Sequence, residues 1–154
     1  NKVLLMGAIG APFKKTYEIT RLLSFYGDPR IARYREMMHS FVHDPSAMPE
    51  LEDIVQMRYK VAIDPQVRAV SEVMFAAMQD GMDKLIIPEA ALGRLPHHVC
   101  IVHGRQDRIV PLETSLYFLQ HLKHAELHVL DRCGHWAQTQ RWDAMYPLIV
   151  KHFV

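Results

Sequence analysis

Three short runs of apolar residues predict buried strands, one near the start of the chain and two in its second half. They cover residues 3–6, 99–102 and 127–130. Gly7 ends the first run, and Pro96 and Gly104 bound the second. Runs of this length between turn residues are typical of parallel strands that are covered on both faces.

Between the first two runs, the apolar residues change to helical spacing. Breaks at Gly27-Asp28-Pro29, at two further Pro-containing turns near residues 45 and 49, and at Asp64-Pro65 divide this region. Asp28 is a plausible first residue for the helix over 31–42, and Asp64 for the helix over 65–81. With helices before Gly27 and over 50–62, the pattern predicts about four helices without an intervening strand.

After Gly81 strands and helices alternate again. Leu116, Leu119 and Leu122 have regular spacing in a predicted helix over 114–122. A closing helix is predicted by the apolar stripe Trp142, Met145, Tyr146, Ile149 and Phe153. The order strand, helix, strand, helix implies a parallel sheet with right-handed crossovers. We therefore expect an α/β fold with three segments: a core strand and loop (1–12), a helical insertion (13–81) and an α/β core (82–154).

Composition excludes several classes of protein. The 154 residues are 49% hydrophobic and 23% charged, with a formal net charge of +1, so no basic face predicts a nucleic-acid partner. No apolar window is long enough to span a membrane. Two cysteines suggest no disulfide framework and, without a signal-peptide pattern, a cytoplasmic protein. Because the chain begins inside a predicted strand, we expect that an N-terminal half precedes it.

Two loops that follow predicted strands carry residues for catalysis. Asp107 lies in His103-Gly104-Arg105-Gln106-Asp107-Arg108-Ile109-Val110-Pro111, and His135 lies in Asp131-Arg132-Cys133-Gly134-His135-Trp136. The carboxyl ends of parallel strands meet at one edge of the sheet, where ligands bind. A buried carboxylate there orients one imidazole nitrogen, and the other nitrogen serves as a base. Gly134 would allow a tight turn before the histidine.

Both loops resemble the acid and histidine loops of α/β-hydrolases, in which a helical lid lies between nucleophile and acid. Over essentially the whole chain the resemblance is to meta-cleavage product hydrolases, and most to the 2-hydroxymuconic semialdehyde hydrolases. Phe25-Tyr26-Gly27-Asp28-Pro29, the helix with Arg58, and Cys133 to Gln138 are its more specific elements. It implies the C-terminal part of an α/β-hydrolase fold, a parallel sheet with an inserted helical lid.

The resemblance also implies roles for individual residues. Asp107 is then the triad acid and His135 the general base. Arg58 would bind or stabilise an anionic dienoate, and Trp136 would line the pocket. Ile109 and Val110 would add apolar wall, with Phe41 a weaker candidate that suits core packing better. The substrate would be a 2-hydroxy-6-oxo-dienoate, cleaved without a cofactor, by an enzyme that is commonly a homo-oligomer.

The nucleophile is missing from this pattern. None of the five serines stands in a Gly-X-Ser-X-Gly motif, so we expect it in a preceding N-terminal half, and this chain alone to be inactive. Another α/β-hydrolase, an esterase or haloperoxidase-like enzyme, remains an alternative. So do a non-catalytic ligand-binding protein and a fragment that folds only with a partner chain. We expect no metal at His39 and His43 or among His121, His124 and His128.

Overall fold

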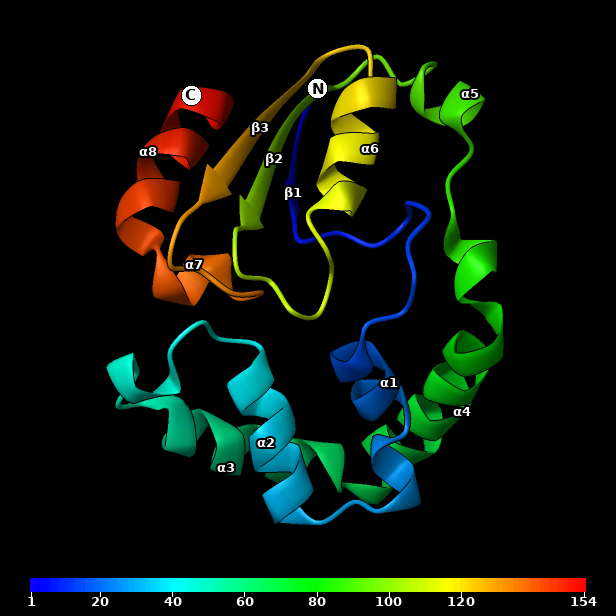
Figure 1. Cartoon of the computed structure of the whole chain (residues 1–154), viewed down its shortest axis with the longest axis vertical. Coiled ribbons are helices and arrows are strands. Elements are labelled where there is room, and N and C mark those ends of the chain that lie inside the picture. The colour runs from blue at the N-terminus through cyan, green and yellow to red at the C-terminus, as the bar shows by residue number, and fades with distance from the viewer.

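A computed structural model describes all 154 residues and contains one parallel sheet of three strands (Figure 1). The strands are β1 (Lys2–Met6), β2 (His98–Gly104) and β3 (Ala125–Leu130), in the order β1-β2-β3. In the register, Val3 pairs with Val99, and Cys100 pairs with Glu126. The three predicted strands and their parallel direction are confirmed. β1 pairs with β2 alone, so its other edge is open.

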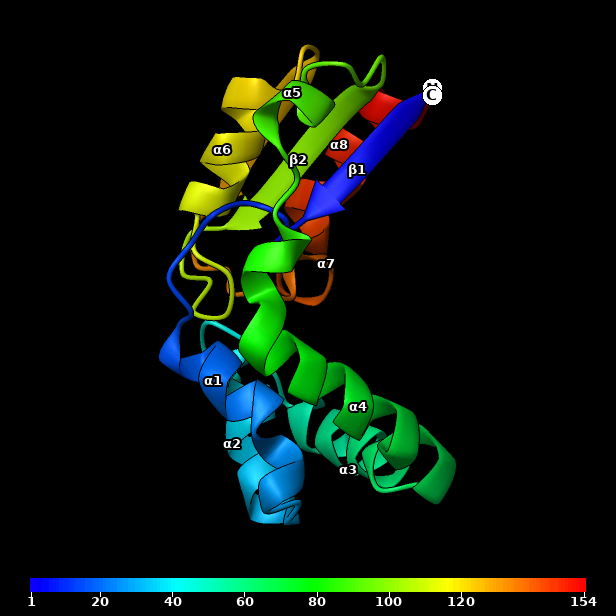
Figure 2. The same ribbon diagram turned by 90° about the vertical axis from the view of Figure 1, so that its right-hand side faces the viewer.

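Helices cover both faces of the sheet (Figures 1 and 2). On one face lies α6 (Glu113–His121), whose Phe118 packs with Val99 and Ile101 of β2. On the other lie α7 (Ala137–Gln140) and α8 (Trp142–Phe153). There Met145 packs with Cys100 and Val102. Successive residues of β2 thus enter two separate cores, as the alternation of side chains along a strand requires.

The buried faces of two helices differ from the apolar stripes in the sequence. In α8 Met145 is fully buried, but Trp142 and Tyr146 are about half exposed. In α6 Phe118 and its neighbours Thr114 and Ser115 are buried, whereas Leu116 and Leu119 face outward. Both helices form, and only part of each predicted stripe faces the core: Met145 and Ile149 of α8, and Leu122 directly after α6, pack there. Apolar residues occur on both sides of each helix, so spacing alone does not select the packed side.

Residues 17–85 form a separate helical layer, the lid. It contains α1 (Tyr17–Leu23), η1 (Phe25–Gly27), α2 (Ile31–Ser40), η2 (Pro45–Ala47), α3 (Leu51–Ala62), α4 (Pro65–Gly81) and η3 (Met82–Leu85), and α5 (Glu89–Leu92) leads on to β2. The four main helices are confirmed. The Asp64 carboxylate accepts from the backbone N–H groups of Gln66 and Val67 and caps α4. Asp28 does not begin α2: it binds Arg30, which is the residue before that helix.

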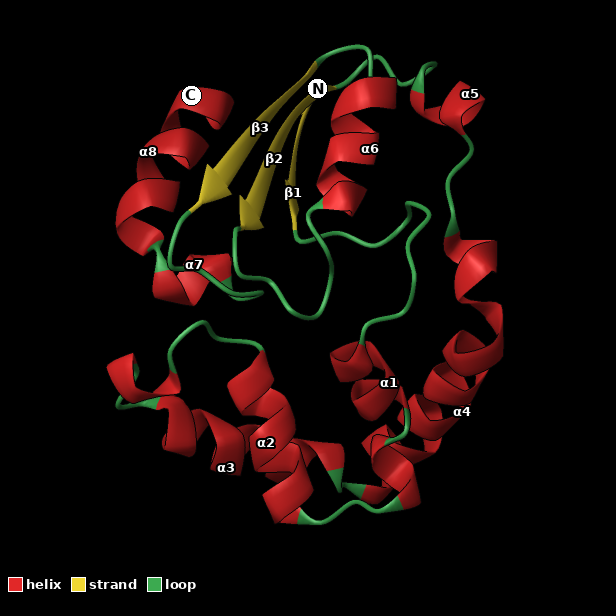
Figure 3. Ribbon diagram, in the orientation of Figure 1, coloured by secondary structure: helices red, strands yellow, loops and turns green.

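The lid lies beyond the carboxyl ends of the strands (Figures 1 and 3). Both chain termini lie at the opposite end of the sheet (Figure 2). The lid core is built mainly from its own side chains, among them Phe25, Met38 and Val55, but it also takes in Ile109 and Trp136 from the sheet half. The loops after β2 and β3 are therefore held between two packed layers. None of the helices combines the length and the hydropathy that a membrane span requires.

Candidate active site

The side chains of Asp107 and His135 meet at the carboxyl end of the sheet. Asp107 follows β2, His135 follows β3, and Asp107 Oδ2 lies 2.8 Å from His135 Nδ1. The other carboxylate oxygen accepts from the backbone N–H groups of Ile109, at 2.8 Å, and Val110, at 3.0 Å. The Asp107 side chain is 1% exposed and that of His135 is 22% exposed. The Asp107 carboxylate is thus held in place and shielded from solvent, whereas the His135 imidazole is partly exposed.

This geometry determines how the histidine can act. A carboxylate only accepts hydrogen bonds, so Nδ1 of His135 carries the proton. Nε2 then has the free lone pair and can remove a proton from a nucleophile. When the imidazole becomes charged, Asp107 stabilises it from the far side. The pair has the geometry of the acid and base of a catalytic triad.

Gly7, at the end of β1, makes room for this pair. Its φ of +47° lies in the left-handed region that favours glycine. A β-carbon at this position would stand 3.0 Å from His135 Nδ1 and 3.1 Å from Asp107 Oδ2. Any side chain would therefore press on the hydrogen bond between acid and histidine. In the sequence, this glycine was recognisable only as the end of a strand.

His103 stabilises the loop that carries Asp107, a role that the sequence pattern did not indicate. It is fully buried, its Nε2 lies 3.0 Å from the Val110 carbonyl, and its Nδ1 lies 2.7 Å from Ser115 Oγ. The carbonyl can only accept, so Nε2 donates and Ser115 donates to Nδ1. Burial lowers the pKa of His103, and the nearby Asp107 carboxylate opposes this shift only in part. His103 is therefore neutral, and its hydrogen bonds to Val110 and Ser115 stabilise the loop that carries Asp107.

The histidine loop is bonded to the lid through backbone groups. The Phe41 carbonyl accepts from His135 N at 2.8 Å and from Trp136 N at 3.3 Å. The Gln140 side chain accepts from the N–H groups of both His43 and Gly134. Gly134 is needed because its Cα passes the lid backbone: a β-carbon there would lie 2.7 Å from the Phe41 oxygen. The tight turn expected at Gly134 falls instead at Arg132, whose φ is +50°.

The other residues singled out in the sequence surround the pair. The Phe41 ring lies 5.2 Å from those of both His135 and Trp136, between centroids. Arg58, on α3, places its guanidinium 4.7 Å from the centre of the Trp136 ring and forms no ion pair in the chain. Ile109 and Val110 are buried in the lid core. Arg58 is thus beside the histidine loop with its charge unpaired.

No serine of the chain meets His135. Ser24 and Ser40 bond to backbone within the lid, and Ser46 bonds to Asp44. Ser115 is committed to His103, and Ser71 lies on α4. None of the five serines is therefore bonded to His135.

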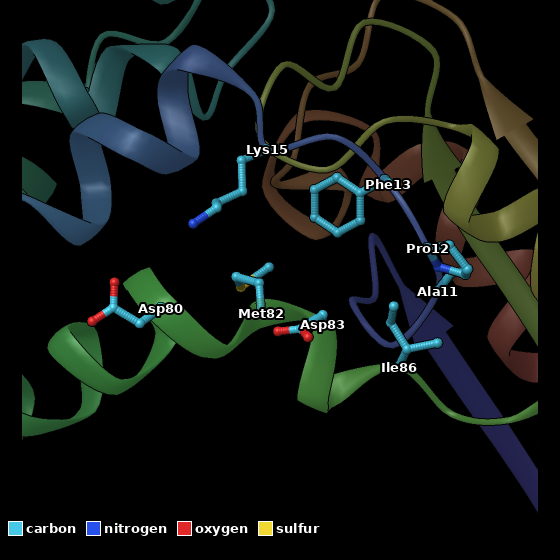
Figure 4. Close-up of a pocket in the computed structure, with 8 residues that line it drawn as sticks. All are labelled: Ala11, Pro12, Phe13, Lys15, Asp80, Met82, Asp83 and Ile86. Atoms are coloured by element: carbon cyan, nitrogen blue, oxygen red, sulfur yellow. The ribbon is translucent and has the colours of Figure 1, made fainter.

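One cavity of the chain lies away from the pair. It has a volume of about 540 Å³, between the loop that leads into α1 and the end of α4 with η3. Figure 4 shows Phe13 and Lys15 on one side and Asp80, Met82 and Asp83 on the other. Neither Asp107 nor His135 lines it. This cavity therefore does not mark the candidate active site, and the position of the acid–histidine pair is the better guide.

Comparison with known proteins identifies the relatives of the chain. No protein-family model matches it. Over 96% of its length it is 31% identical to the 2-hydroxymuconate semialdehyde hydrolase of Pseudomonas putida, and it covers 52% of that protein. The matched part is the C-terminal portion. The chain thus spans about half the length of the curated relatives it matches.

Solved structures give the same result. The 2-hydroxy-6-oxo-6-phenylhexa-2,4-dienoate hydrolase of Rhodococcus sp. strain RHA1 is 61% identical, with a TM-score of 0.96 over 99% of this chain and 55% of the other. A meta-cleavage product hydrolase of Pseudomonas fluorescens IP01 is 31% identical, with a TM-score of 0.89 over 99% of this chain and 55% of that one. The predicted fold, part of an α/β-hydrolase with an inserted lid, is confirmed, as is the resemblance to meta-cleavage product hydrolases.

Proposed function

We propose that this chain supplies the acid, the histidine and the lid of a meta-cleavage product hydrolase. The observation that carries the proposal is the buried Asp107 carboxylate, anchored by two backbone N–H groups and bonded to His135 at 2.8 Å. The relatives' names supply the substrate class, a 2-hydroxy-6-oxo-2,4-dienoate. The serine would come from the part of the relatives that this chain does not cover.

In the proposed reaction, His135 moves the protons. The dienol substrate first becomes its keto form, which turns the carbon to be released into a better leaving group. Water, activated directly or through the serine, then gives its hydroxyl to the ketone carbon. The carbon–carbon bond breaks, the ketone carbon leaves as a carboxylic acid, and the released carbon takes the remaining proton. Asp107 keeps the imidazole in the required tautomer throughout.

Arg58 is proposed to bind the anionic end of this substrate. A guanidinium is always charged and pairs well with a planar carboxylate. Its stacking on Trp136 fixes its position next to the histidine loop, and it has no acidic partner within the chain to displace. Phe41 and Trp136 would then form the aromatic wall on the lid side, and Ile109 and Val110 the support behind the acid loop.

A chimera tests the proposed function. Residues 1–154 replace the matching portion of the Rhodococcus enzyme, which keeps its own nucleophile. We expect the chimera to consume 2-hydroxy-6-oxo-6-phenylhexa-2,4-dienoate, which is measured as a loss of dienoate absorbance. The substitution His135→Ala should abolish this activity. A folded chimera that hydrolyses a simple aryl ester but not the dienoate would favour the esterase alternative. A folded chimera without either activity would favour a ligand-binding protein.

We further propose that the protein acts in the cytoplasm as a homo-oligomer. Both cysteines are free and buried, which fits a reducing compartment. Val70 and Val73 on α4 are about 70% exposed. Exposed apolar side chains on one helix favour contact with a second subunit. Light scattering of the chimera checks the assembly, and a monomer at micromolar concentration would contradict it.

A further inference from the structure

At the amino end of the sheet, far from the acid–histidine pair, three side chains of metal-binding type converge. Cys100 is on β2, Glu126 is its register partner on β3, and His152 is in the last turn of α8. One ligand atom from each lies within 4.8 Å of the others. Cys100 stands four residues before the end of β2, about 13 Å at strand spacing. The cluster is therefore separate from the catalytic loops.

We propose that Cys100, Glu126 and His152 bind a zinc ion that ties α8 to the sheet. Thiolate, carboxylate and imidazole are the usual ligands of Zn²⁺, at distances of about 2.0 to 2.3 Å. A tetrahedral site holds its ligand atoms roughly 3.5 Å apart, so closure needs side-chain movements of about 1 Å. The mixed sulfur, nitrogen and oxygen set favours zinc over calcium or magnesium, which prefer oxygen alone.

The hydrogen bond of His152 leaves one ring nitrogen free to bind a metal ion. Its Nε2 lies 3.0 Å from the Val3 carbonyl oxygen, which can only accept, so Nε2 carries the proton. The lone pair is then on Nδ1. Histidine ligands in metal sites commonly donate their other N–H to a backbone carbonyl in this way, which fixes the tautomer and the ring.

A second histidine lies near the site on the same face of β3, although it is not within 4.8 Å of all three ligand atoms. His128 is two residues beyond Glu126, and its Nε2 lies 3.5 Å from Glu126 Oε1. This nitrogen is buried and has no hydrogen-bond partner, which is unusual for a buried polar atom. Coordination would satisfy it.

The site can be reached from solvent. A cavity of about 380 Å³ opens beside it, lined by Glu126, His152 and the stacked pair His98 and His124. Lys151 also contacts Glu126, at 3.4 Å between Nζ and Oε2, but it is mostly exposed and free to turn away. The Cys100 thiol binds as thiolate, so one proton passes to solvent for each zinc bound.

Cobalt(II) is the probe for this site. The chain, freed of any histidine tag, is titrated with Co²⁺ and then with Zn²⁺. We expect one equivalent of Co²⁺ to produce a thiolate-to-cobalt charge-transfer band, which Zn²⁺ removes. Cys100→Ala should abolish the band. Cys133→Ala is the matched control, because Cys133 is equally buried and free but follows β3 at the other end, and it should keep the band.

Two milder variants keep the test informative if Cys100→Ala does not fold. Glu126 and His152 are partly exposed, so Glu126→Gln and His152→Gln should fold while binding Co²⁺ at least tenfold more weakly. Zn²⁺ should also raise the Tm of the wild-type chain, and of neither variant, because an ion that binds only the folded state stabilises it. Absence of the band from folded wild-type chain overturns the proposal. So does a band that survives Cys100→Ala, or equal affinity in both glutamine variants. The same titration of the chimera tests the site in a complete hydrolase fold, independently of its activity.

Discussion

At the carboxyl end of the sheet the reactive side chains stand on loops beyond the strands, whereas at the amino end they stand on the strands and on α8. The Asp107 carboxylate accepts from two backbone N–H groups, and the backbone N–H of His135 donates to a lid carbonyl. At the amino end, only one of the three side chains, that of His152, bonds to a backbone group, the Val3 carbonyl. A cavity opens beside Glu126 and His152. One end is fixed before any ligand arrives, and the other must close around its ion.

The difference has a physical origin. Catalysis gains from a preorganised acid and base, because misplacement by 1 Å costs a large factor in rate. A metal ion organises its own ligands, since each bond to it is strong and short. The carboxyl end should therefore be sensitive to small steric changes that the amino end tolerates.

Loss of the proposed general base should have the largest effect. In the chimera, His135→Ala should lower turnover of the dienoate at least about a thousandfold, as removal of a triad member does in serine hydrolases. His97→Ala is the control at the amino end and should leave turnover within a factor of two. Stopped-flow absorbance measures both. Comparable losses in the two variants would mean that His135 acts through stability and not through catalysis.

A methyl group at Gly7 should be nearly as harmful to catalysis. Gly7→Ala places a carbon 3.0 Å from His135 Nδ1 in a backbone with φ of +47°. We expect a loss of about 1–2 kcal/mol in the free energy of unfolding from the backbone alone. Turnover by the chimera should fall about a hundredfold from displacement of the acid–histidine pair.

Gly27→Ala is the matched control for Gly7→Ala. Nothing lies within 4 Å of a β-carbon there, and its φ is not positive. Its unfolding midpoint in urea and its turnover should both stay near those of the parent. If Gly7→Ala behaves in the same way, the acid–histidine contact is looser than the structure has it.

The contrast between the two ends also explains what the sequence could predict. Strands 3–6, 99–102 and 127–130 were visible as apolar runs, and the loops after them therefore had to meet at one edge. Asp107 and His135 were recognisable because each lies in a compact motif after a strand. The residues of the proposed zinc site are far apart in the sequence: 26 residues separate Cys100 from Glu126, and another 26 separate Glu126 from His152. Only the strand register and the packing of α8 bring them together.

Other features depended on three-dimensional contacts in the same way. His103 stood inside the acid motif, but its bonds to Ser115 and the Val110 carbonyl required the placement of α6. The need for glycine at position 134 came from the approach of the lid backbone, which no local pattern encodes. The outward orientation of Leu116 and Tyr146 likewise follows from which side of each helix meets the sheet.

A smaller effect is expected at Arg58. Arg58→Ala in the chimera should lower turnover at least tenfold, about 1.4 kcal/mol, with only a slight change in stability because Arg58 itself is exposed. Arg68→Ala is the control, since Arg68 also lies over an aromatic ring, that of Tyr26, but away from the acid–histidine pair. Arg58→Lys should recover part of the rate. Equal rates for both alanine variants would remove Arg58 from the substrate site.

The smallest predicted effect is a pH dependence of stability that originates at His103. Burial lowers the pKa of this histidine from its usual 6.5, so below about pH 6.5 the unfolded chain binds a proton that the folded chain does not. The free energy of unfolding should therefore fall as the pH drops below 6.5, by at most about 1.4 kcal/mol per pH unit from this group. Urea unfolding between pH 5 and 8 measures the slope. His103→Gln has nothing to protonate and should flatten it, whereas Ser115→Ala keeps the imidazole and should keep the slope. An unchanged slope in His103→Gln would mean that His103 is charged in the folded state, and a charged ring next to Asp107 would compete with His135 for that carboxylate.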